Sequence, residues 1–426
     1  MISRLRKFAQ IAQKRAPILI AYGASKALQI VVTILIAHLF TKTEAGSIFY
    51  LVGLVALAQG IGAIGLDSFV SYVYPRYSRS QKLWKMRQYL WLGVIISIPV
   101  TLFLSLPLFV ERPDRTTPEV LILITVVVLC TMSAIYRRIG RTAFLGAAAR
   151  LKAILHDTTV ASAFLIILLL AIPVGSAMAF SGLLLLAYIG AGIWAWFSLN
   201  RLLPASPIGT KALPAPPARR MLLLMSLPSL MSQGIAQLLN RVDIILLAPL
   251  STPDQVADFS VAVRVTFLLQ AIVELTNFIA GPLLLKLDRV PLAQRRRFAL
   301  AVLSATTVMT LAIIVPCILF PATILTTLFG PAYAEAADVL RILALGKLFT
   351  TPFVALLPLF VLLGLNRKLA RIMLVAAAVN LVIDLFLIPG YGALGAAIGA
   401  TVALGIMGLG YLNLLRETLT GKTEAL

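Results

Sequence analysis

The sequence predicts an all-α polytopic membrane protein with twelve transmembrane helices, and three observations indicate this class. The 426 residues are 60% hydrophobic and 12% charged, with a mean hydropathy of +0.98, which is far too apolar for a soluble domain. The apolar stretches reach the length of about 20 residues that a helix needs to cross a bilayer. Lys and Arg are concentrated between alternate apolar stretches.

Short polar connections separate the twelve expected spans. The spans cover residues 17–40, 46–75, 84–110, 119–143, 156–173, 178–200, 221–249, 257–285, 298–320, 337–363, 369–388 and 391–415. Residues 1–16 precede them as a basic segment in which Ile2, Leu5 and Phe8 recur at helical spacing. That pattern is typical of an amphipathic helix on a membrane surface, so we expect this segment to lie along the cytoplasmic face.

The distribution of Lys and Arg predicts the orientation. With the N-terminus inside, the cytoplasmic segments carry 29 of the 37 basic residues, the outer loops carry 4, and 4 lie within spans. Both termini are therefore expected to be cytoplasmic. The same bias accounts for the net charge of +21, so no nucleic-acid partner is predicted. All outer loops are short, which argues against a large extracellular catalytic domain.

The chain is expected to form two six-helix lobes. Residues 201–220 are rich in proline and basic at both ends, and they read as a cytoplasmic linker between lobes at 17–200 and 221–415, with a tail at 416–426. The residues from Thr41 to Gly46 parallel those from Thr252 to Ala257 at an offset of 211. An even number of helices in each lobe predicts parallel repeats.

Four basic residues lie within the spans: Lys26, Arg241, Arg264 and Lys347. A charge in hydrocarbon costs roughly 3 kcal/mol on insertion scales, so such residues usually face a protein interior or a water-filled cavity. We interpret them as a lumenal site for an anionic substrate. The alternative is structural ion pairing, in which Asp254, Asp258 or Glu274 would be the partner of Arg264. The chain has no Gly-x-x-x-x-Gly-Lys phosphate loop and no His-Glu-x-x-His motif, which favours a transporter over an enzyme.

A second polar set combines Asp243, Asn380, Asp384 and Thr401. Asn380 and Asp384 are four residues apart and so share one helix face. Counted from the outer ends of their spans, Asp243, Asn380 and Asp384 could meet at one depth. Two carboxylates with amide and hydroxyl oxygens suit a small hard cation such as Na⁺, or a shared proton. The alternative is a hydrogen-bonded packing cluster. No cofactor or other metal is predicted.

The chain contains several short motifs in a characteristic order. They are Thr-Glu-Ala-Gly at 43–46, Gly-Ala-Ile-Gly-Leu-Asp at 62–67, Phe-Gly-Pro-Ala-Tyr at 329–333, Gly-Leu-Asn-Arg at 364–367 and Pro-Gly-Tyr-Gly-Ala-Leu-Gly-Ala-Ala at 389–397. With Asp243 and Asn380, they resemble the Wzx-type polysaccharide flippases of the multidrug/oligosaccharidyl-lipid/polysaccharide exporter superfamily. The resemblance implies a MATE-like fold that moves undecaprenyl-diphosphate-linked oligosaccharide to the outer leaflet of the bacterial inner membrane by alternating access.

The resemblance has further implications for substrates and partners. The cargo would be a repeat unit of O-antigen, and so of lipopolysaccharide, or of another surface polysaccharide, with polymerase and chain-length proteins as candidate partners besides membrane lipid. The related lipid II flippases use an Asp, an Asn and Asp four apart, and a Thr as a sodium site, a pattern that Asp243, Asn380, Asp384 and Thr401 resemble. A cation-coupled multidrug antiporter, a lipid II-type flippase and a membrane polymerase or ligase stay as alternatives. The sequence leaves the glycan, the ion and the oligomeric state open.

Overall fold

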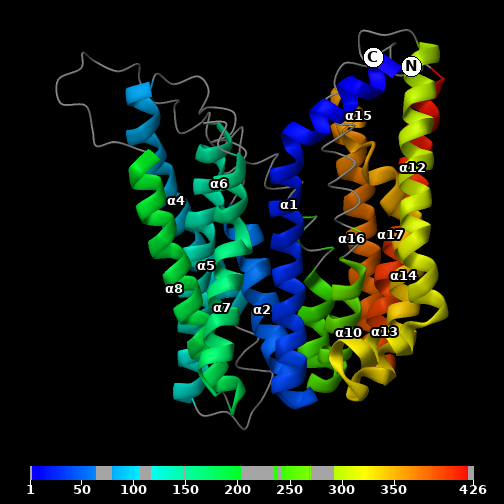
Figure 1. Ribbon diagram of the computed structural model, residues 1–426. Helices are drawn as coiled ribbons and strands as arrows, with labels where there is room; N and C mark the ends of the chain where they lie inside the picture. Colours follow the sequence, from blue (N-terminus) through cyan, green and yellow to red (C-terminus); the bar gives the residue numbers. More distant parts are fainter. Residues whose placement is uncertain are drawn as a thin grey trace. The chain divides into compact units, whose positions relative to one another are not determined.

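The computed structural model divides into two compact units, one formed by residues 20–241 and the other by residues 1–19 with 242–426 (Figure 1). We call them the N-terminal and the C-terminal unit. The described residues are 2–63, 79–105, 117–146, 150–173, 175–202, 235, 237, 239, 241–267, 269 and 292–420. Every regular element in these ranges is a helix. Most of the expected linker and parts of several expected spans lie outside them, as do Asp67 and Glu274.

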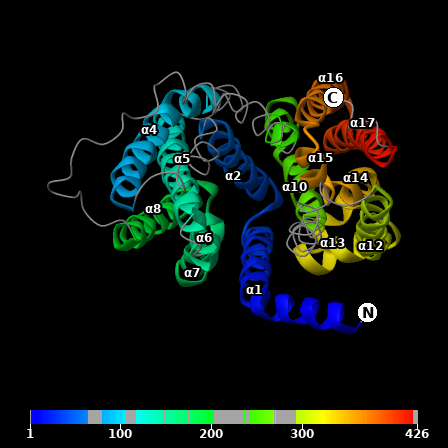
Figure 2. The same ribbon diagram turned by 90° about the horizontal axis from the view of Figure 1, so that it is seen from above.

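The N-terminal unit contains most of α1 and the helices up to α8. Their bounds are α1 Ile2–Leu39, α2 Lys42–Gly62, α4 Arg79–Ser105, α5 Thr117–Gly146, α6 Arg150–Ile154, the π turn η3 Leu155–Thr159, α7 Val160–Ala171 and α8 Ala177–Leu202. The helix α5 packs against α4, α2 and α8, and α7 packs against α8. Figures 1 and 2 show these helices standing side by side.

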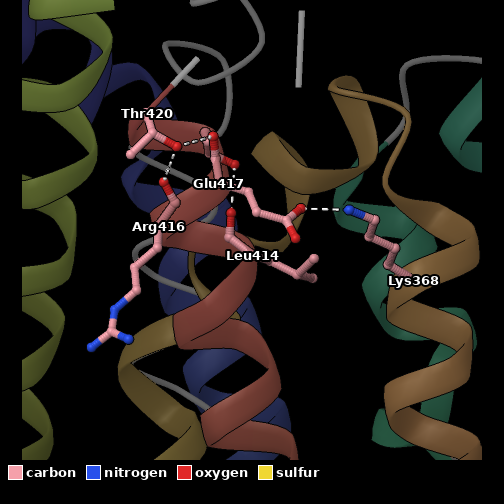
Figure 3. Close-up of polar contacts among 6 residues, drawn as sticks. Lys368, Leu414, Arg416, Glu417 and Thr420 are labelled. Carbon is pink, nitrogen blue, oxygen red and sulfur yellow. Dashed lines mark hydrogen bonds and ion pairs between the residues drawn. The ribbon is translucent and has the colours of Figure 1, made fainter. Parts of the chain in front are cut away.

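The C-terminal unit contains residues 242–250 of a helix that covers 241–250. The following elements are α10 Pro253–Thr266, α12 Leu292–Leu319, α13 Pro321–Phe329, the 3₁₀ turn η5 Pro331–Ala336, α14 Ala337–Val354, α15 Leu357–Leu362, α16 Asn366–Tyr391 and α17 Ala393–Leu419. The helix α17 packs between α16 and α14, while α12 and α10 pack against α14 (Figure 2). Near the start of α16 and the end of α17, the Lys368 ammonium donates to Glu417 at 2.6 Å (Figure 3).

The helices carry apolar side chains on their outer surfaces, as lipid-facing helices do. Within the described ranges, six helices are long and apolar enough to cross a membrane, among them α2, α16 and α17. On α16 the buried residues form one narrow stripe of Leu369, Ala376, Asn380, Asp384 and Ile388. Exposed apolar side chains cover its other faces, and Phe386 is 79% exposed. Polar side chains inside and apolar side chains outside are the reverse of the pattern in a soluble helix. This arrangement confirms the predicted all-α polytopic membrane class.

Helix α14 ends within the span expected at 337–363. It stops at Val354, and α15 begins at Leu357. Pro358 has no N–H, so it cannot donate to the carbonyl four residues earlier and the helical ladder breaks. The Thr306 hydroxyl of α12 donates to the Pro352 carbonyl at 3.1 Å, which supplies a partner beside the break. By contrast, Pro99 lies within a continuous α4.

The span expected at 156–173 begins earlier in the structure. Helix α6 already starts at Arg150, and a single π turn joins it to α7. The Thr159 hydroxyl donates to the Ile154 carbonyl at 3.0 Å, and its oxygen lies 2.7 Å from the Ser25 hydroxyl oxygen. The helical segment thus extends beyond the N-terminal end of the expected span, through the stretch where Arg150 and Lys152 interrupt the apolar pattern.

The proposed internal repeat has a structural counterpart in two helix starts. Thr41 caps α2 by accepting from the Glu44 N–H at 3.4 Å. Thr252 caps α10 by accepting from the Gln255 N–H at 3.5 Å. The cap pairs keep the offset of 211 found in the sequence. Threonine suits this position because its oxygen satisfies an N–H that lacks an intrahelical partner.

Candidate functional site

Asp243, Asn380 and Asp384 meet inside the C-terminal unit, and we call them the carboxylate cluster. The Asn380 side-chain amide nitrogen donates to Asp243 Oδ1 and to Asp384 Oδ2, at 3.1 Å in each case. One amide nitrogen thus bridges the two carboxyl groups. The structure therefore brings together three of the four residues that the sequence places in a cation site.

Helix geometry and a glycine position the cluster. Asn380 and Asp384 are one turn apart on the buried stripe of α16, so both point into the bundle. Gly399 of α17 lies directly opposite, since a Cβ atom there would be 2.1 Å from Asp384 Oδ1. Small residues let membrane helices approach closely, and here the missing side chain makes room for the Asp384 carboxyl.

The cluster is buried but its oxygens are incompletely satisfied. Asn380 and Asp384 are 0% exposed and Asp243 is 5% exposed. Asp384 Oδ1 and Asn380 Oδ1 are buried without a hydrogen-bond partner among the described residues. Removing an ionised carboxylate from water costs several kcal/mol unless a counter-charge compensates. An arrangement with two acidic groups and spare acceptor oxygens can hold a small cation or a proton.

Thr401, the fourth residue of the predicted cation site, contacts α14. Its hydroxyl donates to the Ile342 carbonyl at 2.9 Å. A Cβ atom at Gly346 would be 2.8 Å from the Thr401 hydroxyl oxygen, so the side chain lies flat against α14. Thr401 thus helps to hold α17 against α14, and a role as an ion ligand stays a prediction.

The four predicted substrate-binding cations divide between the units. Lys26 and Arg241 belong to the N-terminal unit, and Arg264 and Lys347 belong to the C-terminal unit. All four side chains are half-buried. Arg264 places its guanidinium 5.4 Å from the centre of the Phe267 ring. A common lumenal site for the four stays a prediction.

Sequence reasoning missed a buried arginine in the N-terminal unit. Arg137 is one of the basic residues whose distribution predicts the orientation, yet it is 2% exposed and its guanidinium carbon lies 5.1 Å from the centre of the Tyr188 ring. Val127, Cys130 and Ala134 are also buried. Arg137 continues their spacing of three to four residues, which is the signal that could have identified its orientation.

His156 also has a defined buried environment in the π turn. Its Nε2 atom is 2.6 Å from the Ser198 hydroxyl. Its ring centre lies 4.4 Å from that of Phe144 and 4.8 Å from that of Trp194. The described residues contain no group of three or more His, Cys, Asp or Glu side chains suited to a metal ion. The ring contacts place the His156 side chain of η3 between Phe144 of α5 and Trp194 of α8.

A family profile described as "Polysaccharide biosynthesis protein" matches residues 11–286, well over half of the chain. The chain belongs to this family. A curated relative, an uncharacterized membrane protein of Methanocaldococcus jannaschii, is 34% identical over 103 residues, which are 23% of this chain and 20% of that protein. The match thus covers about a fifth of the relative's length.

Two solved structures have a similar fold. "Lipid II flippase MurJ, inward closed conformation" is 14% identical, with a TM-score of 0.70 over 95% of this chain and 91% of that one. An inward-facing multidrug resistance MATE family transporter of the MOP superfamily is 18% identical, with a TM-score of 0.64 over 95% and 96% of the two chains. The predicted MATE-like fold is thus confirmed. The protein is a multi-pass membrane protein of the polysaccharide biosynthesis protein family with a MATE-like fold.

Proposed function

We propose that the protein moves an undecaprenyl-diphosphate-linked oligosaccharide from the inner to the outer leaflet of the bacterial inner membrane, with both termini cytoplasmic. Its cargo is a repeat unit of O-antigen or of another surface polysaccharide. The observation that carries the proposal is a buried carboxylate cluster in a member of the polysaccharide biosynthesis protein family. We further propose that an ion, Na⁺ or H⁺, binds at this cluster and drives the cycle by alternating access.

The coupling follows from the charges of the cluster. Two neighbouring carboxylates repel each other when both are ionised, so the buried cluster needs a bound cation or proton. A ligand shifts a conformational equilibrium only by its differential affinity for the two states. An arrangement of helices that buries the cluster therefore binds the ion tightly, and an arrangement that opens it to water releases the ion. No phosphate-loop motif supplies ATP energy instead.

The four intramembrane cations are the proposed contacts for the diphosphate. Arginine presents a planar fork that matches phosphate oxygens, and lysine offers a compact charge. Lys26, Arg241, Arg264 and Lys347 are half-buried, which leaves each side chain partly accessible. Their charge favours an anionic cargo and opposes the cationic drugs that an antiporter would carry.

Reconstituted transport of a lipid-linked sugar tests this function. Proteoliposomes that contain the protein should move a fluorescent diphosphate-linked glycolipid between leaflets, and an imposed gradient of H⁺ or Na⁺ should accelerate the movement. Transport of a cationic dye in place of the glycolipid would overturn the substrate assignment. Glycolipid movement with no response to either gradient would overturn the ion coupling and leave the flippase assignment intact.

Removing a lumenal cation should block export. We expect Lys26→Ala and Arg264→Ala to lower glycolipid transport by at least about tenfold, because a charge-assisted hydrogen bond contributes on the order of 1.5–3 kcal/mol. Expression and thermal stability should stay near those of the wild type. The surface change Arg341→Ala, whose side chain is 45% exposed, is the control. Full transport by both lumenal variants would exclude these residues from substrate binding.

The N-terminal segment should lie on the cytoplasmic side. We expect a cysteine in place of Ser3 to react with a membrane-impermeant thiol reagent only when the inner face is accessible. Both native cysteines are buried, so the unaltered protein gives a low background and serves as the control. Labelling of intact cells from the outside would reverse the proposed topology.

A further inference from the structure

A cleft lies on the N-terminal unit where α4, α5 and α8 stand side by side (Figures 1 and 2). It has a volume of about 180 Å³ and is lined by Leu90, Trp91, Tyr136, Trp196 and Asn200. We call it the aromatic cleft. The ring centres of Trp91 and Tyr136 are 6.5 Å apart. One water needs only roughly 10–15 Å³, so the aromatic cleft has room for a small molecular group.

The aromatic cleft belongs to a surface of the kind that meets lipid. Trp91 of α4 is 57% exposed and Trp196 of α8 is 49% exposed. Along the same two helices, Phe103 and Ile193 are also exposed. Large exposed apolar surfaces mark sites of contact with a membrane or a partner, and these helices are membrane-spanning. A ligand that enters the aromatic cleft is therefore a component of the bilayer.

The aromatic cleft lies at the depth of the lipid headgroups. Trp196 is six residues from the end of α8 at Leu202, which is about 9 Å along the helix axis. Trp and Tyr side chains are enriched at this level because their rings are amphipathic. Asn200 offers two amide N–H donors and Tyr136 offers a hydroxyl. In the proposed orientation, this end of α8 is cytoplasmic.

The charges near this end favour an anionic headgroup. Arg201 follows Asn200 and is exposed. The first nine residues of α4 include four basic ones: Arg79, Lys82, Lys85 and Arg87. Neither α4 nor α8 contains Asp or Glu. The acidic residue of α5, Glu119, is in its first turn, about 25 Å along the helix from Tyr136. Basic pockets between membrane helices attract anionic headgroups.

We propose that the aromatic cleft binds the headgroup of one anionic phospholipid, and that this lipid bridges α4, α5 and α8. The aromatic rings pack against the glycerol backbone and the upper acyl chains. The Asn200 amide donates to the phosphate, and Arg201 supplies the counter-charge. None of the five lining residues is charged, which suits the single charge of a phosphodiester better than a diphosphate, because a charge removed from water needs compensation.

Binding of phosphatidylglycerol to the purified, delipidated protein tests the inference. Native mass spectrometry in detergent should show a first lipid adduct at a lower concentration of phosphatidylglycerol than of zwitterionic phosphatidylethanolamine. We expect Arg201→Gln to weaken phosphatidylglycerol binding about fivefold, as for one basic residue near an anionic surface, and to leave phosphatidylethanolamine binding unchanged. Arg416→Gln makes the same change at an exposed position near the end of α17, and should alter neither affinity.

Tryptophan fluorescence locates the bound lipid. The chain contains four tryptophans, and two of them line the aromatic cleft. Phosphatidylglycerol with brominated acyl chains, added at a stoichiometric amount in detergent, should quench the wild type more strongly than a variant with Trp91→Phe and Trp196→Phe. Phenylalanine keeps an aromatic ring at both positions, so this variant should stay folded. Phe103→Ala, at an exposed position elsewhere on α4, should be quenched like the wild type.

Four results would decide against the inference. Equal affinities of the wild type for the two phospholipids would overturn the anionic headgroup. Unchanged phosphatidylglycerol binding in Arg201→Gln, or unchanged quenching in the tryptophan variant, would place the lipid elsewhere. Tighter binding of undecaprenyl phosphate than of phosphatidylglycerol, lost in Arg201→Gln, would make the cleft a cargo site.

An isosteric variant keeps the test decisive if Arg201→Gln purifies poorly. Asn200→Asp keeps the size of the side chain and adds a negative charge beside the phosphate. It should weaken phosphatidylglycerol binding and leave phosphatidylethanolamine binding near that of the wild type. Equal effects on both lipids would contradict the proposed headgroup contact. These measurements involve no transport, so their failure leaves the proposed function untouched.

Discussion

Replacing Asp384 by Asn is expected to abolish the response of glycolipid transport to the driving gradient while leaving the protein folded. Asparagine keeps the size of the side chain and one acceptor oxygen for the Asn380 amide, but it cannot be ionised. We therefore expect the variant to transport at the same rate with and without the gradient, because no ion can then bind preferentially in one arrangement of the helices. The measurement is transport in proteoliposomes with and without an imposed gradient.

Asp243→Asn should be at least as severe as Asp384→Asn. Asp243 is the member that the helix at 241–250 contributes, and it accepts the 3.1 Å hydrogen bond from Asn380. The control is Asp338→Asn, the same chemical change in a side chain that is 65% exposed. It should transport like the wild type. If both cluster variants respond to the gradient as the wild type does, the cluster is a packing feature and the coupling proposal fails.

The meeting of Asp243, Asn380 and Asp384 could be anticipated from the sequence because it depends on simple periodicity. A spacing of four residues places Asn380 and Asp384 on one helix face, and counting inward from the ends of the spans gives their depth. Charged residues within a span must also avoid lipid, so their inward direction is determined. These rules use only local geometry and the thickness of the membrane.

Features that arise from contacts between helices could not be predicted in this way. The role of Gly399 becomes apparent only when α17 is placed against Asp384, because many glycines in membrane helices serve close packing alone. The break between α14 and α15 near Pro358 could not be predicted from the proline alone, since Pro99 and Pro316 lie within continuous helices. Whether a helix breaks depends on partners such as the Thr306 hydroxyl.

The position of Arg137 shows a limit of counting charges. The positive-inside rule uses arginine as a topology signal, and this use does not depend on whether the side chain faces lipid headgroups or the bundle. Here the side chain lies over Tyr188 and is almost fully buried. An arginine can thus support the predicted orientation and occupy the interior at the same time, and only tertiary packing separates the two roles.

Adding one methyl group at Gly399 is expected to disrupt the cluster. The new Cβ atom would be 2.1 Å from Asp384 Oδ1 and 3.2 Å from the Asn380 amide nitrogen, far inside normal contact. Either the Asp384 side chain leaves its position or α17 moves away from α16. Overpacking a tight contact typically costs about 1–3 kcal/mol. We therefore expect Gly399→Ala to lower the melting temperature of the purified protein and to remove gradient-driven transport.

Gly405 provides a matched control on the same helix. A Cβ atom at Gly405 would meet nothing within 4 Å, and alanine is favoured over glycine within a helix by roughly 0.5–1 kcal/mol. Gly405→Ala should therefore match or exceed the wild type in melting temperature and keep full transport. A second variant, Gly399→Ala with Asp384→Ser, shortens the opposing side chain and should regain much of the lost stability without regaining ion coupling. If Gly399→Ala alone behaves like Gly405→Ala, Gly399 does not make room for the Asp384 carboxyl, and the described geometry of the cluster is wrong.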